Sequence, residues 1–293
     1  MPKNKNKNIN TNTNKHQIYS EAFPPNKNGE RKKLSSFSSY HEKLIGEEID
    51  IKKIIYKPLT KSYKEEIKKL HKEWFPVEYD DDYFENIFIN KYGGYFTIGA
   101  FYKIKEQEII LGLALCQYRE ISDYFINHTS PQSIEEICKN IDFNEEVQSY
   151  LRCEDYLCAY IMTIGVLDEC RKLHIGSEII KNIINKVLWD NICVGIYLDV
   201  INYNNSAIKF YERNGFQKVS TIKNYYELKG TYYDSEVFLK IFTRKEKDDF
   251  RAKNYSILRK IINLLVLTPI NIVFKVIFFF LLCQCFRNKI KTE

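Results

Sequence analysis

The sequence of 293 residues contains little glycine and proline, with 11 and 7 residues respectively. This scarcity excludes a collagen-like, fibrous or loop-dominated protein. None of the eight cysteines forms a C-x-x-C pair, which disfavours a zinc ribbon and a thioredoxin-type redox site. An apolar signal peptide is also missing from the N-terminus. We therefore expect reduced thiols in a protein that faces the cytosol.

Metal and nucleic-acid sites are disfavoured as well. The acidic run Asp80–Asp82 lacks the alternating ligands and central glycine of a calcium loop, so we expect no metal. The net charge is +6, and much of the basic excess lies in residues 1–33 and at the C-terminal end. A mild excess of this kind does not indicate nucleic acid as a partner. The hydrophobic content of 44% is sufficient for a sizeable core.

Composition divides the chain into four regions. Residues 1–45 are rich in Asn and Lys, which predicts a disordered tail or a basic tether to an acidic membrane. Residues 46–243 form the predicted folded domain, and residues 244–256 a charged linker. Residues 257–293 are apolar but interrupted by charges and Pro269, and neither half offers the ~20 clean residues needed to span a bilayer.

This C-terminal segment predicts helices that lie in a membrane interface, where Lys and Arg reach the head groups. Cys283 and Cys285 are candidates for S-acylation. The alternative is a pair of helices packed on the folded domain.

Hydrophobic periodicity predicts an α/β domain. One further short helix is expected after the aromatic stretch that begins at Trp74. The expected strands are 51–58, 95–102, 109–117, 160–166, 196–201, 216–219 and 237–242, and the expected helices are 62–74, 133–140, 175–188 and 205–214.

The stretch Tyr160–Ile184 reads as a strand, a tight polar turn at Asp168–Gly176, and a helix. Such a unit presents backbone N–H groups at a helix N-terminus, where they hold a phosphate. The turn R-K-L-H-I-G resembles the Arg/Gln-x-x-Gly-x-Gly/Ala turn of the GNAT acetyltransferases, which binds the pyrophosphate of acetyl-CoA. His174 stands where that family has its first Gly.

A second motif follows 28 residues later. It matches the GNAT signature Asn-x-x-Ala-x-x-x-Tyr-x-x-x-Gly-Phe at Asn204, Ala207, Tyr211, Gly215 and Phe216. The resemblance implies a GNAT fold, with a mixed, mostly antiparallel sheet flanked by helices and splayed at its centre. Acetyl-CoA is the implied co-substrate. The implied cofactor-binding residues are Met162, Thr163, Ile164, Arg171, Lys172, Leu173, His174, Ile175, Gly176, Ser177, Asn204 and Tyr211.

Residues 50–242 also resemble the membrane-anchored, Golgi-type NatF class of N-terminal acetyltransferases, through W-F-P-V-E-Y, A-Y-I-M-T-I-G-V and N-Y-Y-E-L-K-G. This resemblance implies an enzyme on the cytosolic face of a secretory membrane. It implies Tyr160 as a base, Tyr211 as the acid for the leaving thiolate, and Asp199 where the family has a His base. The implied substrate-binding residues are Glu78, Tyr79, Tyr225 and Tyr226.

The predicted function is acetyl transfer from acetyl-CoA to the α-amine of protein N-termini, with Met followed by a non-acidic residue as the expected substrate. Direct attack is expected, because no cysteine stands at a nucleophile position. Two alternatives stay open: acetylation of lysine or small amines, and a catalytically weak membrane-bound adaptor. The predicted partners are therefore N-terminal peptides, as the substrate, and a membrane surface. Whether the protein also forms a homodimer is left open.

Overall fold

The computed structural model describes residues 49–75, 79–89, 94–120, 145–151 and 156–267. The chain divides into two units, Met1–Phe242 and Thr243–Glu293. Three sequence-based predictions lie outside the described residues: the disordered tail at 1–45, the helix at 133–140 and the substrate residue Glu78.

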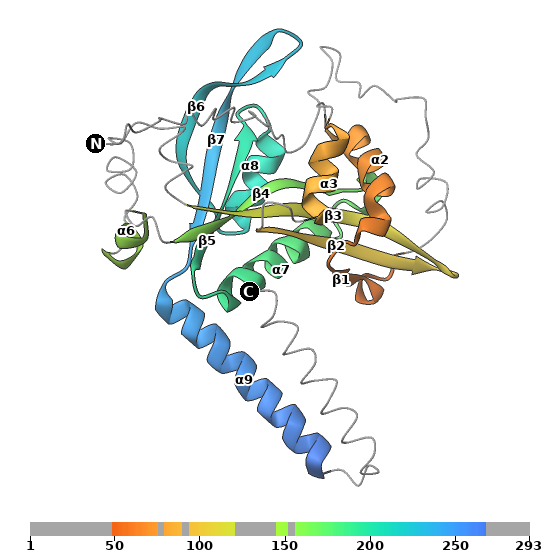
Figure 1. Ribbon diagram of the computed structural model, residues 1–293, viewed down its shortest axis with the longest axis vertical. Coiled ribbons are helices and arrows are strands. Elements are labelled where there is room, and N and C mark those ends of the chain that lie inside the picture. The colour runs from red at the N-terminus through yellow and green to blue at the C-terminus, as the bar shows by residue number, and fades with distance from the viewer. Residues whose placement is uncertain (1–48, 76–78, 90–93, 121–144, 152–155, 268–293) are drawn as a thin grey trace, which may run out of the picture. The chain divides into compact units, whose positions relative to one another are not determined.

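A seven-stranded sheet forms the centre of the first unit (Figure 1). Its order is β1-β2-β3-β4-β5-β7-β6, and every neighbouring pair is antiparallel except the parallel pair β4–β5. This confirms the mixed, mostly antiparallel sheet. The strands are β1 (Ile55–Lys57), β2 (Tyr95–Ile104), β3 (Gln107–Glu120), β4 (Leu157–Val166), β5 (Cys193–Ile201), β6 (Gln217–Leu228) and β7 (Thr231–Ile241).

Helices cover both faces of this sheet. Gly112 and Leu113 are successive residues of β3, so they face opposite sides. Gly165, the partner of Leu113, lies against the ring of Trp74, while Gly112 lies against Ile175. The helix ending at Trp74 and the helix beginning at Ile175 therefore pack on opposite faces. The helices of this unit are α2 (Lys64–Trp74), α3 (Asp81–Ile89), α6 (Glu145–Leu151), α7 (Ile175–Trp189) and α8 (Asn205–Arg213).

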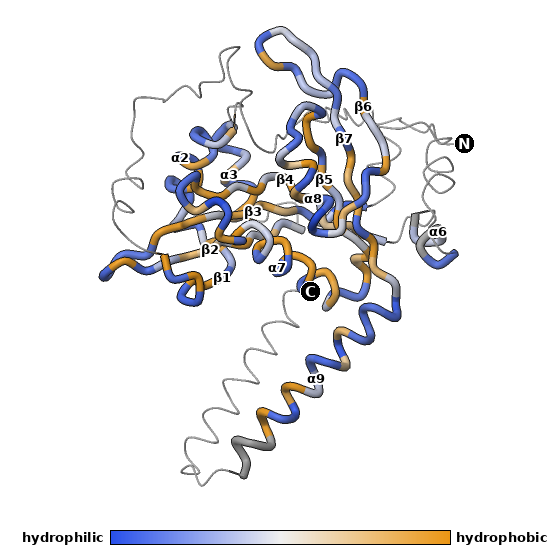
Figure 2. The backbone as a smooth tube through the Cα atoms, turned by 180° about the vertical axis from the view of Figure 1, so that it is seen from behind, coloured by the Kyte–Doolittle hydropathy of each residue, from blue (hydrophilic) through white to orange (hydrophobic). Residues whose placement is uncertain are grey.

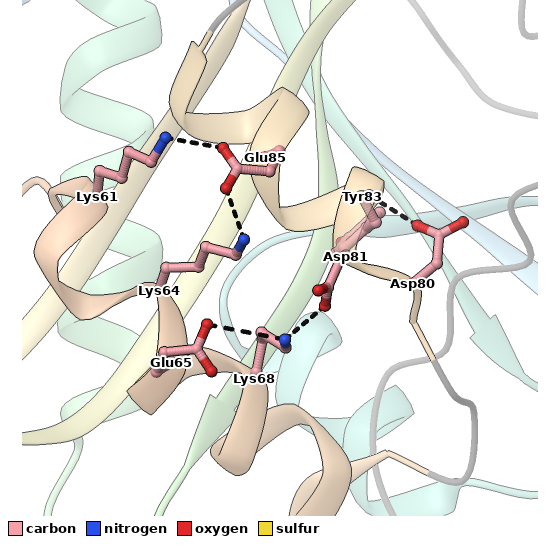
Figure 3. A network of polar contacts seen from close by, with 8 residues as sticks. All are labelled: Lys61, Lys64, Glu65, Lys68, Asp80, Asp81, Tyr83 and Glu85. Atoms are coloured by element: carbon pink, nitrogen blue, oxygen red, sulfur yellow. Dashed lines mark hydrogen bonds and ion pairs between the residues drawn. The ribbon is translucent and has the colours of Figure 1, made fainter.

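An ion-pair network joins α2 to α3 (Figure 3). Glu85 accepts from Lys64 at 2.6 Å and pairs with Lys61 at 2.9 Å. Lys68 pairs with Asp81 at the start of α3. These exposed and half-exposed pairs each contribute little on their own, but together they hold the two helices in one relative position.

The acidic run Asp80–Asp82 lies at the start of the short helix that was expected after the aromatic stretch. Asp80 Oδ1 accepts a hydrogen bond from the Tyr83 backbone N–H at 2.7 Å, which caps the first turn of α3. Asp81 and Asp82 follow in the first turn, where negative charge is favourable.

The predicted strand 51–58 is shorter in the structure. Residues Ile51–Lys53 form a 3-10 helix, because Asp50 accepts a hydrogen bond from the Lys52 backbone N–H at 3.0 Å. Within the predicted strand 51–58, only the residues of β1 form a strand. The charged turn predicted at 103–108 is also narrower, since β2 continues to Ile104 and β3 begins at Gln107.

The Tyr-rich segment 225–233 belongs to a long hairpin, whereas the sequence predicted two short strands on either side of it. Strands β6 and β7 pair as far as Leu228 and Thr231. Lys229 and Gly230 both have positive φ, which is the geometry of a two-residue hairpin turn. The polar residues between the tyrosines concealed the alternation that identifies a strand.

The second unit contains α9 (Arg244–Leu267). The predicted linker 244–256 is thus helical, and the reason is a capping box. The Thr243 hydroxyl accepts from the Glu246 N–H at 3.2 Å, and the Glu246 carboxylate accepts from the Thr243 N–H at 2.8 Å. Figure 2 shows that the first half of α9 is mostly hydrophilic and that apolar and hydrophilic residues alternate in the coloured part beyond it.

The predicted membrane segment 257–293 is described only as far as residue 267. In that described part, Ile257 and Ile261 are exposed apolar residues of α9, and Tyr255, just before the segment, is exposed as well. Across the described ranges, no helix has both the length and the apolar character that crossing a bilayer requires.

Candidate active site

The sheet opens along a seam between β4 and β5. The two parallel strands pair from Leu157–Cys193 to Tyr160–Tyr197, and β4 then continues to Val166 paired with β3 only, among the described strands. A register shift opposite Leu115 and Cys116 leaves Met162 as an extra residue in β4, which bends the strand at this point. The central splay predicted from the resemblance is therefore present. Met162, Thr163 and Ile164 lie along its edge.

The turn after β4 has a strained backbone. Lys172 has a φ of 70° and His174 a φ of 59°, both in the left-handed region that non-glycine residues seldom adopt. His174 is the N-cap of α7, and its side chain makes no capping hydrogen bond. The first N–H groups of α7 therefore have no partner within the helix or from its cap residue. Arg171 pairs with Asp168 at 2.7 Å.

Close packing favours Gly176 in the first turn of α7. A side-chain carbon there would meet the Phe210 ring of α8 at 3.2 Å. The second predicted motif thus lies beside the first in space. Leu173, Ile175 and Ser177 belong to the same turn and first helical residues.

Tyr160 and Asp199 meet where the two strands part. The Tyr160 hydroxyl donates to Asp199 Oδ2 at 3.1 Å, and the Ser235 hydroxyl donates to Asp199 Oδ1 at 3.4 Å. All three residues are buried. Burial, and then the negative charge of Asp199, raise the pKa of Tyr160 well above its ordinary value. Tyr160 is therefore a neutral phenol, and the buried carboxylate is the stronger base of the pair.

Two residues of this site were not predicted from the sequence. The Arg119 guanidinium carbon lies 4.5 Å from the centre of the Tyr160 ring, and Tyr197 stacks on the same ring with centroids 4.7 Å apart. Burial is the main cause that raises the pKa of Tyr197 above its ordinary value. The period-2 pattern could have identified Tyr197, because it lies two residues before Asp199 on the same face of β5.

The first of the two substrate tyrosines on β6 lies at the site. A register shift between Ile222 and Tyr226 interrupts β6, and Asn224 there has a φ of 52°. Such a bulge turns a side chain out of its regular direction. Burial, and then the negative charge of Asp199, raise the pKa of Tyr225.

Tyr226 occupies a different environment. It is completely buried and packs against Ile201, in a cluster that Tyr225 also joins. Its predicted contact with the substrate stays a prediction, and the structure gives it a packing role.

Tyr79 belongs to an aromatic cluster at the ends of α2 and α3. Its ring lies 4.7 Å from Tyr83 and 5.4 Å from His71, centre to centre. His71 is buried, and its Nδ1 and Nε2 atoms lie 2.9 Å from the Ile67 carbonyl and 3.1 Å from the Thr163 hydroxyl. Because a carbonyl only accepts, Nδ1 carries the proton and Nε2 accepts from Thr163. The aromatic cluster is thereby connected to β4 at the seam.

The two polar residues of the second motif are both buried. Asn204 is the N-cap of α8, where its Oδ1 accepts from the Ala207 N–H at 3.1 Å. Tyr211 packs between helix and sheet, with its ring 6.2 Å from that of Phe238 on β7. Their roles toward the cofactor remain predictions. In the described part of the chain, no three His, Cys, Asp or Glu side chains are grouped so that they could hold a metal ion.

The helix N-terminus beside the opened seam can hold a phosphate-bearing cofactor, and the buried tyrosine–aspartate pair can take part in proton transfer. The chain belongs to the acetyltransferase (GNAT) family, whose sequence model matches residues 64–216, more than half of the chain.

Individual relatives agree with this assignment. N-alpha-acetyltransferase 60 of Xenopus tropicalis is 28% identical over 176 residues, which cover 59% of this chain and 63% of that protein. The chain thus spans less than two thirds of this relative. Histone acetyltransferase MCC1 of Arabidopsis thaliana is 22% identical over 188 residues, or 64% of this chain and 69% of that protein. The fold is similar to that of Arabidopsis thaliana NAA60 in complex with acetyl-CoA, with a TM-score of 0.52, 24% identity, and coverage of 64% of this chain and 98% of that one.

Proposed function

We propose that the protein transfers the acetyl group of acetyl-CoA to the α-amino group of protein N-termini. Family membership supports the acetyl-CoA dependence, and the similarity to N-alpha-acetyltransferase 60 supports the choice of acceptor. The observation that carries the proposal is the buried Tyr160–Asp199 hydrogen bond at the point where β4 and β5 part. Acetyl-CoA supplies the thioester that the amine attacks and the thiolate that leaves.

The proton of the attacking amine passes to the Tyr160 oxygen, while the Tyr160 proton passes to Asp199 Oδ2. Tyr160 alone is a poor acceptor at neutral pH because its pKa is raised. Asp199 provides the negative charge that draws the proton through it. In this proposal Asp199 acts through its direct hydrogen bond to Tyr160. Backbone N–H groups along the edge of Met162, Thr163 and Ile164 stabilise the oxyanion.

A panel of acceptors tests this proposal. The purified protein is given acetyl-CoA with a Met-starting peptide, with the same peptide blocked at its α-amine but carrying lysine, and with small amines. We expect transfer to the free N-terminus, and a loss of about 10²-fold or more in kcat for Tyr160→Phe and Asp199→Asn.

Tyr102→Phe is the matched control for these variants. Tyr102 is also a buried strand tyrosine with a hydroxyl that makes a hydrogen bond, to the Asp50 N–H at 3.3 Å, but it lies on β2 away from the seam. Its variant should keep wild-type kcat. Transfer only to the blocked, lysine-containing peptide would overturn the N-terminal assignment.

That outcome would support lysine acetylation, the second candidate, which the similarity to histone acetyltransferase MCC1 favours. Binding of acetyl-CoA without turnover on any amine would support the adaptor. We also propose that the protein works at the cytosolic face of a secretory membrane, the Golgi by resemblance. The exposed apolar residues of α9 and the basic residues Arg259 and Lys260 beside them support a membrane contact.

A further inference from the structure

Arg119 lies at the end of β3 in direct contact with the predicted proton relay. Arg119 of β3 pairs with Cys158 of β4, and Gln117 of β3 pairs with Tyr160 of β4. Arg119 and Tyr160 are therefore diagonal neighbours on the two strands. Diagonal neighbours on one face of a sheet are close enough for long side chains to touch. The guanidinium carbon is 4.5 Å from the centre of the Tyr160 ring.

The Arg119 side chain has two further interactions. Its Nε donates to Gln117 Oε1 at 2.9 Å, and its charge acts on the nearby Tyr197, whose pKa it lowers against the larger effect of burial. Tyr197 stacks on Tyr160 at 4.7 Å with an angle of 19° between the rings. One cation, two phenols and the carboxylate of Asp199 therefore form a single ordered array across three strands.

We propose that Arg119 is a positioning residue for the acetyl transfer, holding the Tyr160 ring so that its hydroxyl points at Asp199. The inference rests on the proposed function. As the amine nitrogen bonds to the acyl carbon and the C–S bond breaks, the amine proton moves to Tyr160 and the Tyr160 proton to Asp199. The proton then leaves Asp199 through Tyr160 for solvent.

The charge of Arg119 assists this transfer. Whenever the Tyr160 proton leaves before the amine proton arrives, the ring gains phenolate character, which a cation above its face stabilises. A guanidinium can stack on a ring and keep a hydrogen bond at once, whereas an ammonium supplies only a point charge. The polar groups around Tyr160 are Arg119 and Gln117 from β3, Tyr197 and Asp199 from β5, Tyr225 from β6 and Ser235, through Asp199, from β7.

Steady-state kinetics of the full chain with a Met-starting peptide test the inference. Arg119→Gln should lower kcat about ten-fold, as expected for a desolvated cation–ring contact, with the KM for acetyl-CoA little changed. Arg119→Lys should recover part of kcat, because it restores the charge but not the hydrogen bond from Nε to Gln117. Lys57→Gln is the matched control: Lys57 also lies 4.5 Å above a ring, that of Phe101, but on β1 at the far edge of the sheet. It should keep wild-type kcat.

The outcomes separate the two proposals. Wild-type protein that acetylates no amine overturns the proposed function and this inference with it. If the wild type is active and a folded Arg119→Gln variant equals it in kcat, or differs from it only in KM, the inference alone is overturned. Should Arg119→Gln fail to fold, Arg119→Lys decides: a reduced kcat at unchanged KM supports the positioning role, and full kcat contradicts it.

Discussion

At the scale of single residues, His71 is a neutral imidazole enclosed between Ile67 and Thr163. Burial lowers its pKa from 6.5 to about 4, against the opposing effect of the Ile67 carbonyl. The imidazole of His71 therefore takes up a proton near pH 6.5 in the unfolded chain, but only near pH 4 in the folded chain. Stability from this residue is complete above pH 6.5 and is lost as the pH falls toward 4.

We therefore predict that acidification from pH 7 to 4 removes about 3 kcal/mol of unfolding free energy through His71 alone. His71→Gln, which keeps a hydrogen-bonding side chain without a titrating group, should show a flatter pH dependence than the wild type. Urea denaturation of both proteins at several pH values measures the difference. Parallel curves would contradict the prediction.

His174 adopts a backbone conformation that suits glycine. We predict that His174→Gly raises the unfolding free energy by about 1 kcal/mol, because a side chain in the left-handed region is strained. It should also lower the KM for acetyl-CoA, since it removes bulk where the phosphates are expected. Lys105→Gly is the control: Lys105 has a φ of 54° in the β2–β3 turn, so the stability gain should appear there without a change in KM.

The sequence identified central residues of the site, but it did not identify all the residues that contact them. Tyr160 and Asp199 were named from motifs, and they do meet. Arg119 was missed because its contact depends on the register between β3 and β4, which local periodicity does not contain. His71 was not predicted to contact β4. Its bond to Thr163 joins residues 92 positions apart, which no spacing rule predicts.

At the scale of elements, the packing of α2 on β4 depends on the absence of a side chain at Gly165. A methyl group there would lie 2.2 Å from Trp74 Cε3. We predict that Gly165→Ala costs about 1–3 kcal/mol of unfolding free energy, because the ring must move out of a packed core. Chemical denaturation measures this cost. A Gly165→Ala variant as stable as the wild type would contradict this prediction, because it would show that α2 can shift away from β4 at little cost.

Gly230→Ala provides the comparison, since no atom lies within 4 Å of the added carbon. Its cost should come only from the positive φ of 75°. Gly165→Ala therefore measures the steric cost without a positive φ, and Gly230→Ala measures the cost of a positive φ without a steric clash.

Most regular elements were predictable from periodicity alone, since strands β2 to β5 and helices α2, α7 and α8 occur close to their expected positions. The exceptions have local causes. The linker became α9 because of the capping pair Thr243 and Glu246, a T-x-x-E pattern that charge counting overlooks. The hairpin β6–β7 was obscured by polar residues between its tyrosines.

At the scale of the whole molecule, the C-terminal unit offers a test of the membrane proposal. We predict that the full-length protein sediments or floats with vesicles that contain anionic lipid, and that removal of residues 254–293 abolishes this binding. Peptide acetylation should be unaffected, because the family match ends at residue 216. Full-length protein that stays apart from the vesicles would contradict the membrane contact.

The seam in the sheet coincides with a division of the polypeptide. Strands β1 to β4 all precede residue 167, and strands β5 to β7 all follow residue 192. Only four residue pairs of the ladder join the two sets across the seam. A molecule bound between β4 and β5 would thus bridge the earlier and later halves of one chain. Because separating β4 from β5 would release that molecule, its binding would raise the free energy needed to open the seam.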